Sequence, residues 1–279
     1  MNGYAWTSAE LKDILKFPLT IFRKENGFLG IISYDFNNDD LFICSKSTNQ
    51  GDYADMIREQ VSFMNKDFIK SYTKDNNCTL VFEVINPSKD PHIISYENHE
   101  AILLDIIKNT FETEYLSYDE VKRVANILNI KCKEVEYVFE DWDSLYSWRQ
   151  KVKNDMLIKH EGWVIRDQND FQVKYKSRYY SFWKEMRKVK TQLEGNKKVN
   201  KRFETLEEVE VYKLMNSIDK EELKNLTIIQ VANRYYGSKN SNKFWANAEE
   251  ASKIVASWPK WKRDAFGPFP YNYQEEVDE

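Results

Sequence analysis

The chain has 279 residues, of which 42% are hydrophobic and 31% charged, so it can form one large domain or two smaller ones with packed cores. Its net charge of −4 excludes a protein coated in positive charge, although 41 Lys and Arg residues still allow a local basic groove. The three cysteines, Cys44, Cys78 and Cys132, match neither a zinc site nor a complete disulfide framework. There is no apolar run of about 18 residues and no secretory signal pattern, so we expect a cytoplasmic protein.

Helix and strand patterns alternate over the first part of the chain. Residues 7–17 have the spacing of a short amphipathic helix, with Thr7 or Ser8 as its cap and Pro18 ending it. The polar run 37–40 predicts a turn between two strands. In chain order we expect strands over 19–22, 28–34 and 41–45, one helix over 52–72, strands over 79–85, 93–96 and 101–107, helices over 117–128 and 142–153, and a strand pair over 162–166 and 171–175.

The pattern changes after Ser181, where strand signals end and Lys, Glu and long apolar residues dominate. We expect helices over 205–217, 228–236 and 242–258, after a break at 195–197. The fold class predicted from these patterns is α+β, with a mixed first domain over residues 1–190 and a small all-α domain over 191–279.

A lysine in a turn between two strands is the first candidate for chemistry. Lys24 is followed by Glu25, Asn26 and Gly27. A lysine attacks phosphorus only when it is neutral, and burial or nearby positive charge favours that form. Glycine lets the backbone lie close to a nucleotide. Taken alone, this pattern is most often that of a plain turn.

Four further features follow in the chain, each with an ordinary structural alternative. Lys46 lies at a strand end, Glu83 lies in an apolar strand, and Glu161 with Gly162 opens another strand. Alternation along a strand places Lys174 and Lys176 on one face, where two cations are unfavourable unless an anion lies between them. The alternatives are a solvated strand end, a paired core carboxylate and surface lysines.

The order of these features resembles the covalent nucleotidyltransferase superfamily of DNA ligases, RNA ligases and mRNA capping enzymes. The matching stretches are residues 24–27, 45–47, 82–84, 161–164 and 173–177. Within the superfamily, residues 82–87, the pair Ile93 and Ile94, and residues 101–105 are most similar to the phage-type RNA ligase 1 family and the adenylyltransferase domain of fungal tRNA ligases. The resemblance covers about residues 19 to 185.

The resemblance implies a ligase-type nucleotidyltransferase fold, with antiparallel sheets flanked by helices, and ATP with Mg²⁺ (or Mn²⁺) as cofactors. It implies that Lys24 becomes adenylylated, that AMP then passes to an RNA 5′-phosphate, and that a 3′-hydroxyl displaces it. Lys174 and Lys176 would act on the α-phosphate and Glu161 would hold the metal. The residues that would contact the nucleotide are Glu25, Asn26, Gly27, Lys46, Glu83, Glu161 and Gly162.

Two departures from the family pattern stand out. Asn26 occupies a position that is usually Asp, as it also does in fungal tRNA ligases, and this leaves one carboxylate fewer near the metal. Lys24 also comes early, because related RNA ligases carry a sizeable segment before this motif. The chain is then a fragment, an alternative start or a minimal form.

The RNA partner and the competing functions follow from the same patterns. The basic segment 178–202, with Tyr179, Tyr180, Phe182 and Trp183, is either an RNA-tracking surface or a solvated helix on the rim of the core. The expected partner is broken or nicked RNA, such as a tRNA, with an end-healing kinase and phosphatase on another chain or segment. The alternatives are a non-catalytic RNA-binding module and a DNA ligase or capping-type enzyme.

Overall fold

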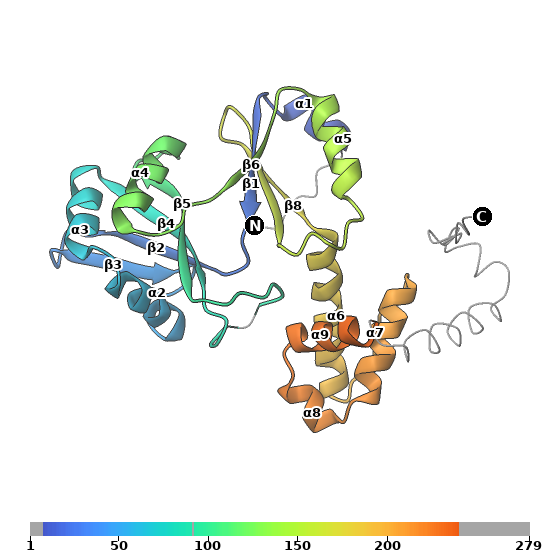
Figure 1. The fold of residues 1–279 in the computed structure, drawn as a ribbon. Helices are drawn as coiled ribbons and strands as arrows, with labels where there is room; N and C mark the ends of the chain where they lie inside the picture. Colours follow the sequence, from blue (N-terminus) through green and yellow to red (C-terminus); the bar gives the residue numbers. More distant parts are fainter. Residues whose placement is uncertain (1–7, 91, 240–279) are drawn as a thin grey trace, which may run out of the picture. The chain divides into compact units, whose positions relative to one another are not determined.

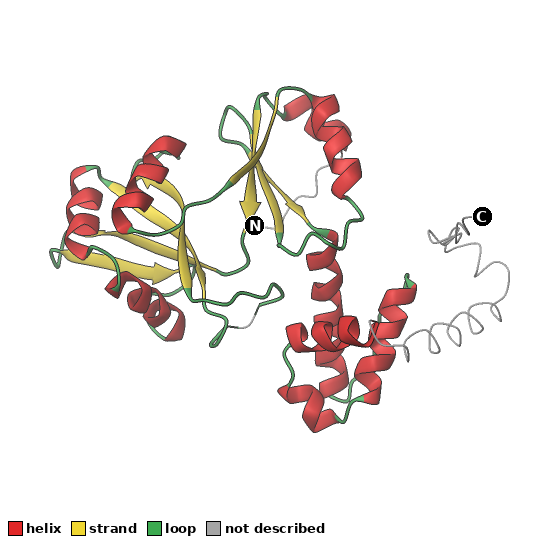
Figure 2. Cartoon of the chain, viewed as in Figure 1, coloured by secondary structure: helices red, strands yellow, loops and turns green. Residues whose placement is uncertain are grey.

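The computed structural model describes residues 8–90 and 92–239 and contains two four-stranded antiparallel sheets, each flanked by helices (Figures 1 and 2). This confirms the predicted α+β class. The chain divides into two compact units, Met1–Ser181 and Phe182–Glu279, and both sheets belong to the first. Within the described ranges, no helix has the length and apolarity that crossing a bilayer requires.

The first sheet carries a layer of three helices on one face. Its strands, in spatial order, are β3 (Asp40–Ser45), β2 (Phe28–Asp35), β4 (Cys78–Ile85) and β5 (Glu100–Lys108). The helices are α2 (Asp52–Ser62), α3 (Lys66–Asp75) and α4 (Tyr118–Leu128).

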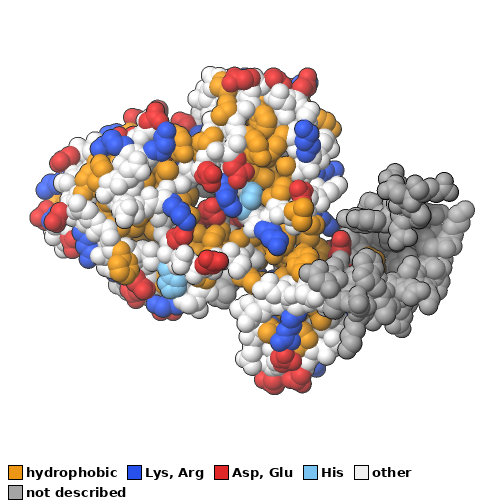
Figure 3. All heavy atoms as spheres, viewed as in Figure 1, with side chains coloured by type: hydrophobic (Ala, Val, Ile, Leu, Met, Phe, Trp, Pro, Cys, Tyr) orange, Lys and Arg blue, Asp and Glu red, His pale blue; other side chains and the backbone are white. Residues whose placement is uncertain are grey.

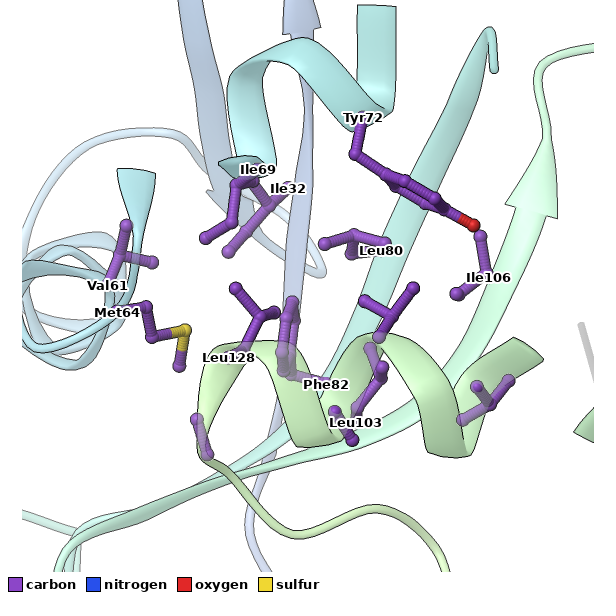
Figure 4. Close-up of a cluster of buried hydrophobic side chains, with 14 of the residues drawn as sticks. Ile32, Val61, Met64, Ile69, Tyr72, Leu80, Phe82, Leu103, Ile106 and Leu128 are labelled. Carbon is purple, nitrogen blue, oxygen red and sulfur yellow. The ribbon is translucent and has the colours of Figure 1, made fainter. Parts of the chain in front are cut away.

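Strand alternation decides which side chains reach these helices. Leu80 and Phe82 on β4 point into a core with Ile32 on β2, and all three are fully buried (Figure 4). From α4, apolar residues at helical spacing, including Val121 and Leu128, complete this core, and Ser117 caps the helix by accepting a hydrogen bond from the Glu120 N–H. The opposite face of the sheet is therefore available for a site.

The second sheet has the spatial order β6-β1-β7-β8 and packs on two helices. Its strands are β6 (Val135–Phe139), β1 (Leu19–Lys24), β7 (Gly162–Arg166) and β8 (Gln172–Lys176), and its helices are α1 (Ser8–Ile14) and α5 (Trp142–Val152). Ile21, Trp163 and Ile165 lie on one face and are buried against Leu145 and Trp148 of α5. The other face carries Lys24 and the predicted lysine pair.

The described part of the second unit is helical. It comprises α6 (Arg178–Glu194), which begins at the end of the first unit, α7 (Leu206–Ser217), α8 (Lys220–Asn225) and α9 (Ile228–Lys239). Thr205 and Glu208 form a capping box at the start of α7. The predicted boundary at residue 190 falls inside α6. The helix expected over 242–258, and with it Trp245, Trp258 and Trp261, lies outside the described residues.

Two predicted elements are wrong. The single helix expected over 52–72 is two helices, because Asn65 accepts a hydrogen bond from the Phe68 N–H and caps a new helix. The strand expected over 93–96 is a loop, because the N–H groups of Ile93 and Ile94 donate to the Asn26 side chain instead of to a neighbouring strand.

Two elements were also missed. Strand β6 has only five residues, and Glu136 is its one charged residue, so its sequence shows no alternation of apolar and polar side chains. Helix α8 has six residues, with Asp219 as its cap. Elements this short carry little periodicity.

Candidate active site

One row of residues crosses three strands of the second sheet. Lys24 at the end of β1 pairs with Gly162 at the start of β7, and Gly162 pairs with Lys176 at the end of β8. Cross-strand partners share a face of the sheet. Residues that are far apart in sequence, and that were predicted to act together, therefore lie side by side.

A cavity of about 260 Å³ lies between the two sheets, on the faces that their helices leave uncovered. The second sheet contributes Lys24 and Lys174 to its lining, and β4 contributes Glu83. Its neighbours Phe82 and Val84 point into the helix-covered core, so strand alternation places Glu83 on the opposite face. Lys24 thus faces a cavity bounded by both sheets.

The carboxylate of Glu161 is the centre of the site. Glu161 is only 4% exposed and lies directly before β7. Its Oε1 lies 3.0 Å from the Lys24 Nζ and also pairs with Lys176, and its Oε2 accepts a hydrogen bond of 2.8 Å from the Asn26 Nδ2. A buried carboxylate is tolerated only with such partners. Glu161 therefore holds the two lysines of the row in one cluster.

Glu83 connects the first sheet to the same cluster. Its Oε1 accepts a hydrogen bond of 2.7 Å from the Gly27 N–H and lies 4.0 Å from the Lys24 Nζ. The Lys24 Nζ also donates to the Glu25 carbonyl oxygen at 3.1 Å. The ammonium group of Lys24 is thus held by oxygen atoms from three segments of the chain.

Asn26 is buried and bonded through both ends of its side chain. Its Nδ2 donates to Glu161, while its Oδ1 accepts from the Ile93 N–H at 3.1 Å and the Ile94 N–H at 3.3 Å. An aspartate could accept the two backbone hydrogen bonds but could not donate to Glu161 when ionised. The asparagine that departs from the family pattern therefore matches its surroundings.

Tyr96 belongs to the site and was missed. Its hydroxyl accepts a hydrogen bond of 2.7 Å from the Asn26 N–H and donates to the Glu25 Oε2 at 2.9 Å. Burial, and then the charge of Glu25, raises the pKa of the Tyr96 hydroxyl, so it stays protonated as a donor. Seventy residues separate Tyr96 from Asn26, and no local pattern could signal this contact.

The two remaining predicted lysines, Lys174 and Lys46, differ in their position relative to the cavity. Lys174 is exposed and lines the cavity, and no carboxylate of the described residues lies within ion-pair distance of it. Lys46 is exposed in the turn after β3 and does not line the cavity. The structure therefore brings Lys24, Lys174 and Lys176 together, whereas Lys46 stays outside.

Both glycines of the site make close backbone approaches. A Cβ at Gly27 would lie 2.2 Å from the Val84 carbonyl oxygen, and a Cβ at Gly162 would lie 2.1 Å from the Tyr175 carbonyl oxygen. Gly162 also has φ +142°, which side chains rarely permit. We expected these glycines to make room for a nucleotide. The atoms that would clash with a side chain at either position instead belong to the backbones of neighbouring strands.

The aromatic residues after β8 do not form a stacking surface. The four residues Tyr179, Tyr180, Phe182 and Trp183 are buried, so their rings pack in the interior and do not contribute to an RNA-tracking surface. On the face shown in Figure 3, Lys and Arg side chains are interspersed with Asp and Glu side chains over the described residues. On that face they form no broad basic area.

The described residues hold no group of three or more His, Cys, Asp or Glu side chains arranged as a metal site. Glu161, the predicted ligand, contacts two ammonium groups and one amide. A metal bound there would need most of its ligands from elsewhere, as Mg²⁺ commonly takes them from water and phosphate. The residues fit an ion that arrives with a phosphate better than a permanently bound one.

Comparison with known proteins gives one family and a set of similar folds. A family model described as RNA ligase matches residues 1–180. An archaeal ATP-dependent RNA ligase shares 12% identity and a TM-score of 0.52, with 90% of this chain and 64% of that chain covered. A second form of that archaeal ligase gives 11% identity, a TM-score of 0.52, and coverage of 84% and 63%.

A protein from Aquifex aeolicus described as an ATP-dependent DNA ligase shares 15% identity and a TM-score of 0.51, with 89% of this chain and 64% of that chain covered. At such identities these likenesses concern the fold alone. The chain spans less than two thirds of the length of each of these proteins. A search of curated proteins gave no significant match.

Proposed function

The chain belongs to the RNA ligase family whose model matches residues 1–180, and from this premise we propose that it is an ATP-dependent RNA ligase that carries AMP on Lys24. The observation that carries the proposal is the position of the Lys24 Nζ. It faces the cavity between the two sheets, with Glu161 3.0 Å away and Lys176 in the same cross-strand row.

In the first step, the ammonium group of Lys24 loses a proton, and its neutral Nζ attacks the α-phosphorus of ATP. An N–P bond forms, the bond from the α-phosphorus to the bridging oxygen breaks, and pyrophosphate leaves. The Glu161 Oε1 lies within hydrogen-bond distance of the Nζ and is the nearest group to accept its proton. Lys174 and Lys176 supply positive charge on the same face of the sheet for the phosphate oxygens.

The later steps transfer AMP and join the RNA ends. The 5′-phosphate of an RNA displaces Lys24 from the phosphorus, which gives an RNA-adenylate and restores the lysine. The 3′-hydroxyl of the other end then attacks that 5′-phosphate, a phosphodiester forms and AMP leaves. Glu83 and Tyr96 position the turn that carries Lys24 through Gly27 and Asn26.

A divalent cation, Mg²⁺ or Mn²⁺, would neutralise phosphate charge when bound. Glu161 is the group that would hold it, directly or through water, because its carboxylate is the most central one in the site. The sparse set of protein ligands among the described residues suits an ion that keeps most of its water.

The biological setting remains part of the proposal. We expect the substrate to be broken or nicked RNA, such as a cleaved tRNA, in the cytoplasm. A 5′-kinase and a 3′-phosphatase, on another chain or segment, would prepare ends with the groups that the joining step needs. The helical second unit is the part that we expect to select the RNA.

The test is covalent labelling with ATP that carries a radioactive α-phosphate. Wild-type protein with Mg²⁺ should retain label after denaturation, and Lys24→Ala should retain none while melting at a similar temperature. Lys131→Ala, which removes an exposed lysine outside the cavity, is the matched control.

Label on another lysine would refute the assignment of Lys24. RNA binding by wild-type protein that takes up no label would favour the non-catalytic alternative, and labelling by GTP or sealing of nicked DNA would favour the capping-type or DNA ligase alternative.

A further inference from the structure

Three charged residues meet at another part of the same cavity, and the proposed chemistry does not use them. Asp105 on β5 accepts from the Lys133 Nζ at 2.6 Å, and both of its oxygens lie 3.0 Å from one terminal nitrogen of Arg166 on β7. All three are largely buried and line the cavity. Arg166 also lies 3.8 Å from Asp170, which is half exposed.

A β-bulge turns Asp105 toward the cavity. Leu103 pairs with Phe82 and Asp105 pairs with Val81, so Leu104 is an extra residue on β5. Leu103 and Ile106 both point into the helix-covered core. Without the extra residue, Asp105 would lie on the face of Leu103 and would be buried in that core. The bulge therefore places the Asp105 carboxylate in the lining of the cavity.

The segment after α4 places Lys133 beside it. The N–H of Leu103 donates to the Lys131 carbonyl, and the N–H of Lys133 donates to the Leu103 carbonyl. These bonds hold Lys133 alongside β5. Burial lowers the pKa of the Lys133 ammonium, and the charge of Asp105 opposes that shift. Lys133 is thus a fixed donor and not a mobile surface lysine.

The cluster lies at a distance from Lys24 that suits a nucleotide. Along β1, Lys24, Phe22 and Thr20 share one face, and Thr20 pairs with Arg166. The row of Arg166 is therefore four residues from that of Lys24, roughly 13 Å along the strand. A lysine side chain followed by a nucleoside monophosphate spans such a separation. A phosphate at Lys24 would leave the base near the charged cluster.

Phe22 and Val164 form an apolar part of the cavity lining between the row of Lys24 and the row of Arg166. The Lys133 Nζ is 4.3 Å from the centre of the Phe22 ring, and the Arg166 guanidinium is 5.7 Å from it. Phe22 pairs with Val164, and both line the cavity. A nucleobase on this apolar surface would present its polar edge to the three charged side chains.

We propose that Asp105, Lys133 and Arg166 read the edge of the purine base and select adenine over guanine, an inference that rests on the proposed use of ATP. Adenine offers an amino donor at N6 beside an acceptor at N7. The Asp105 carboxylate would accept from that amino group, while Lys133 or Arg166 would donate to a neighbouring ring nitrogen. Guanine has an oxygen acceptor in place of the amino group, and a carboxylate facing it is repulsive.

A purely structural role is the competing explanation, because Asp105 and Arg166 join the two sheets. That role predicts lower stability in the variants and an equal loss of affinity for every nucleotide. Base reading predicts instead that the ratio of ATP affinity to GTP affinity changes. The ratio therefore distinguishes the two explanations.

The experiment measures equilibrium binding of ATP and GTP in the Lys24→Ala background, where no covalent step intervenes. Asp105→Asn should shrink the preference for ATP by about tenfold to a hundredfold, because the amide can donate to guanine. Lys133→Met should weaken ATP binding. Glu100→Gln and Lys131→Met are the matched controls, since these residues form a 2.8 Å ion pair on the same two segments but outside the cavity, and they should leave the ratio unchanged.

A nucleotide variant tests the idea even if Asp105→Asn does not fold. Purine riboside triphosphate, which lacks the 6-amino group, should bind the Lys24→Ala protein at least about tenfold more weakly than ATP does. Equal binding of these two nucleotides, or an unchanged ratio in folded Asp105→Asn, would overturn the inference while lysyl–AMP formation by the wild type stands. If neither the wild type nor the Lys24→Ala protein bound any nucleotide, the inference and the proposed function would both fail.

Discussion

At the scale of single residues, the site depends on the ion pairs and the hydrogen bond that the Glu161 carboxylate makes with its three partners. Asn26 donates to this carboxylate with one end of its side chain and accepts two backbone N–H groups with the other. Lys24 and Lys176 share the remaining oxygen of the carboxylate. Any change at these positions therefore leaves a buried charge short of a partner.

Asn26→Asp should make the protein less stable, by about 1–3 kcal/mol, because two carboxylates would then face each other in a buried position. Such a pair holds a proton more tightly when folded than when unfolded. The loss of stability relative to the wild type should therefore shrink as the pH falls from 8 to 5, because a bound proton restores the hydrogen-bond donor that the Asn26 amide provided. Denaturant unfolding at several pH values measures it, with the exposed Asn98→Asp as the control. A deficit that did not vary with pH would contradict this account.

Lys174 and Lys176 should contribute equally to chemistry but unequally to stability. Both lie on the cavity face of β8, so replacing either with Ala should slow lysyl–AMP formation at least about tenfold. Only Lys176→Ala removes a partner of buried Glu161 and should lower the melting temperature. Adenylylation rates and melting curves of the two variants test this together. If Lys174→Ala lost stability in proportion to activity, its assigned role in phosphate binding would be wrong.

At the scale of elements, close backbone contacts hold the strands that carry the catalytic row. Gly162 joins Lys24 on β1 to Lys176 on β8, and its own backbone leaves no room for a side chain beside the Tyr175 carbonyl. The site therefore depends on the spacing between strands as much as on its charged groups.

Gly162→Ala should lower the free energy of unfolding by about 2 kcal/mol or more, because it adds a clash to an unfavourable φ. Adenylylation should fall as well, since β7 and β8 would separate where Glu161 and Lys176 pair. Gly237→Ala in α9 is the control: its Cβ meets open space, so alanine should leave stability unchanged or raise it. Equal stability of the two variants would refute the argument.

At the scale of the whole molecule, every residue assigned to the nucleotide lies in the unit Met1–Ser181. The second unit has its own buried residues, which include Trp183, Val211 and Tyr235. This division supports the proposal that AMP transfer to Lys24 and the choice of RNA belong to different parts of the chain.

A truncation near residue 190 should therefore still form lysyl–AMP but should seal broken RNA poorly. The comparison needs a truncated protein that melts cooperatively, because the cut falls within α6. Radioactive labelling and RNA sealing, measured on the same preparations, separate the two activities. Sealing at the full-length rate would show that the second unit is dispensable, and a folded truncation without labelling would place part of the nucleotide site beyond residue 190.

Much of this protein follows from its sequence alone. The α+β class, most of the strands and the RNA ligase family follow from periodicity and from the order of five short motifs. Alternation along a strand also predicted the shared face of Lys174 and Lys176, because that relation depends on the backbone of one element. Local patterns of this kind need no knowledge of distant residues.

Only the tertiary structure decided the contacts between distant segments. It joined Tyr96 to Asn26, turned the segment 93–96 from an expected strand into a loop, and left Lys46 outside the cavity. It also buried the aromatic residues that follow β8 and turned Asp105 toward the cavity through a bulge. These outcomes depend on strand register and on which buried donors and acceptors find partners across the fold, and a linear pattern carries neither.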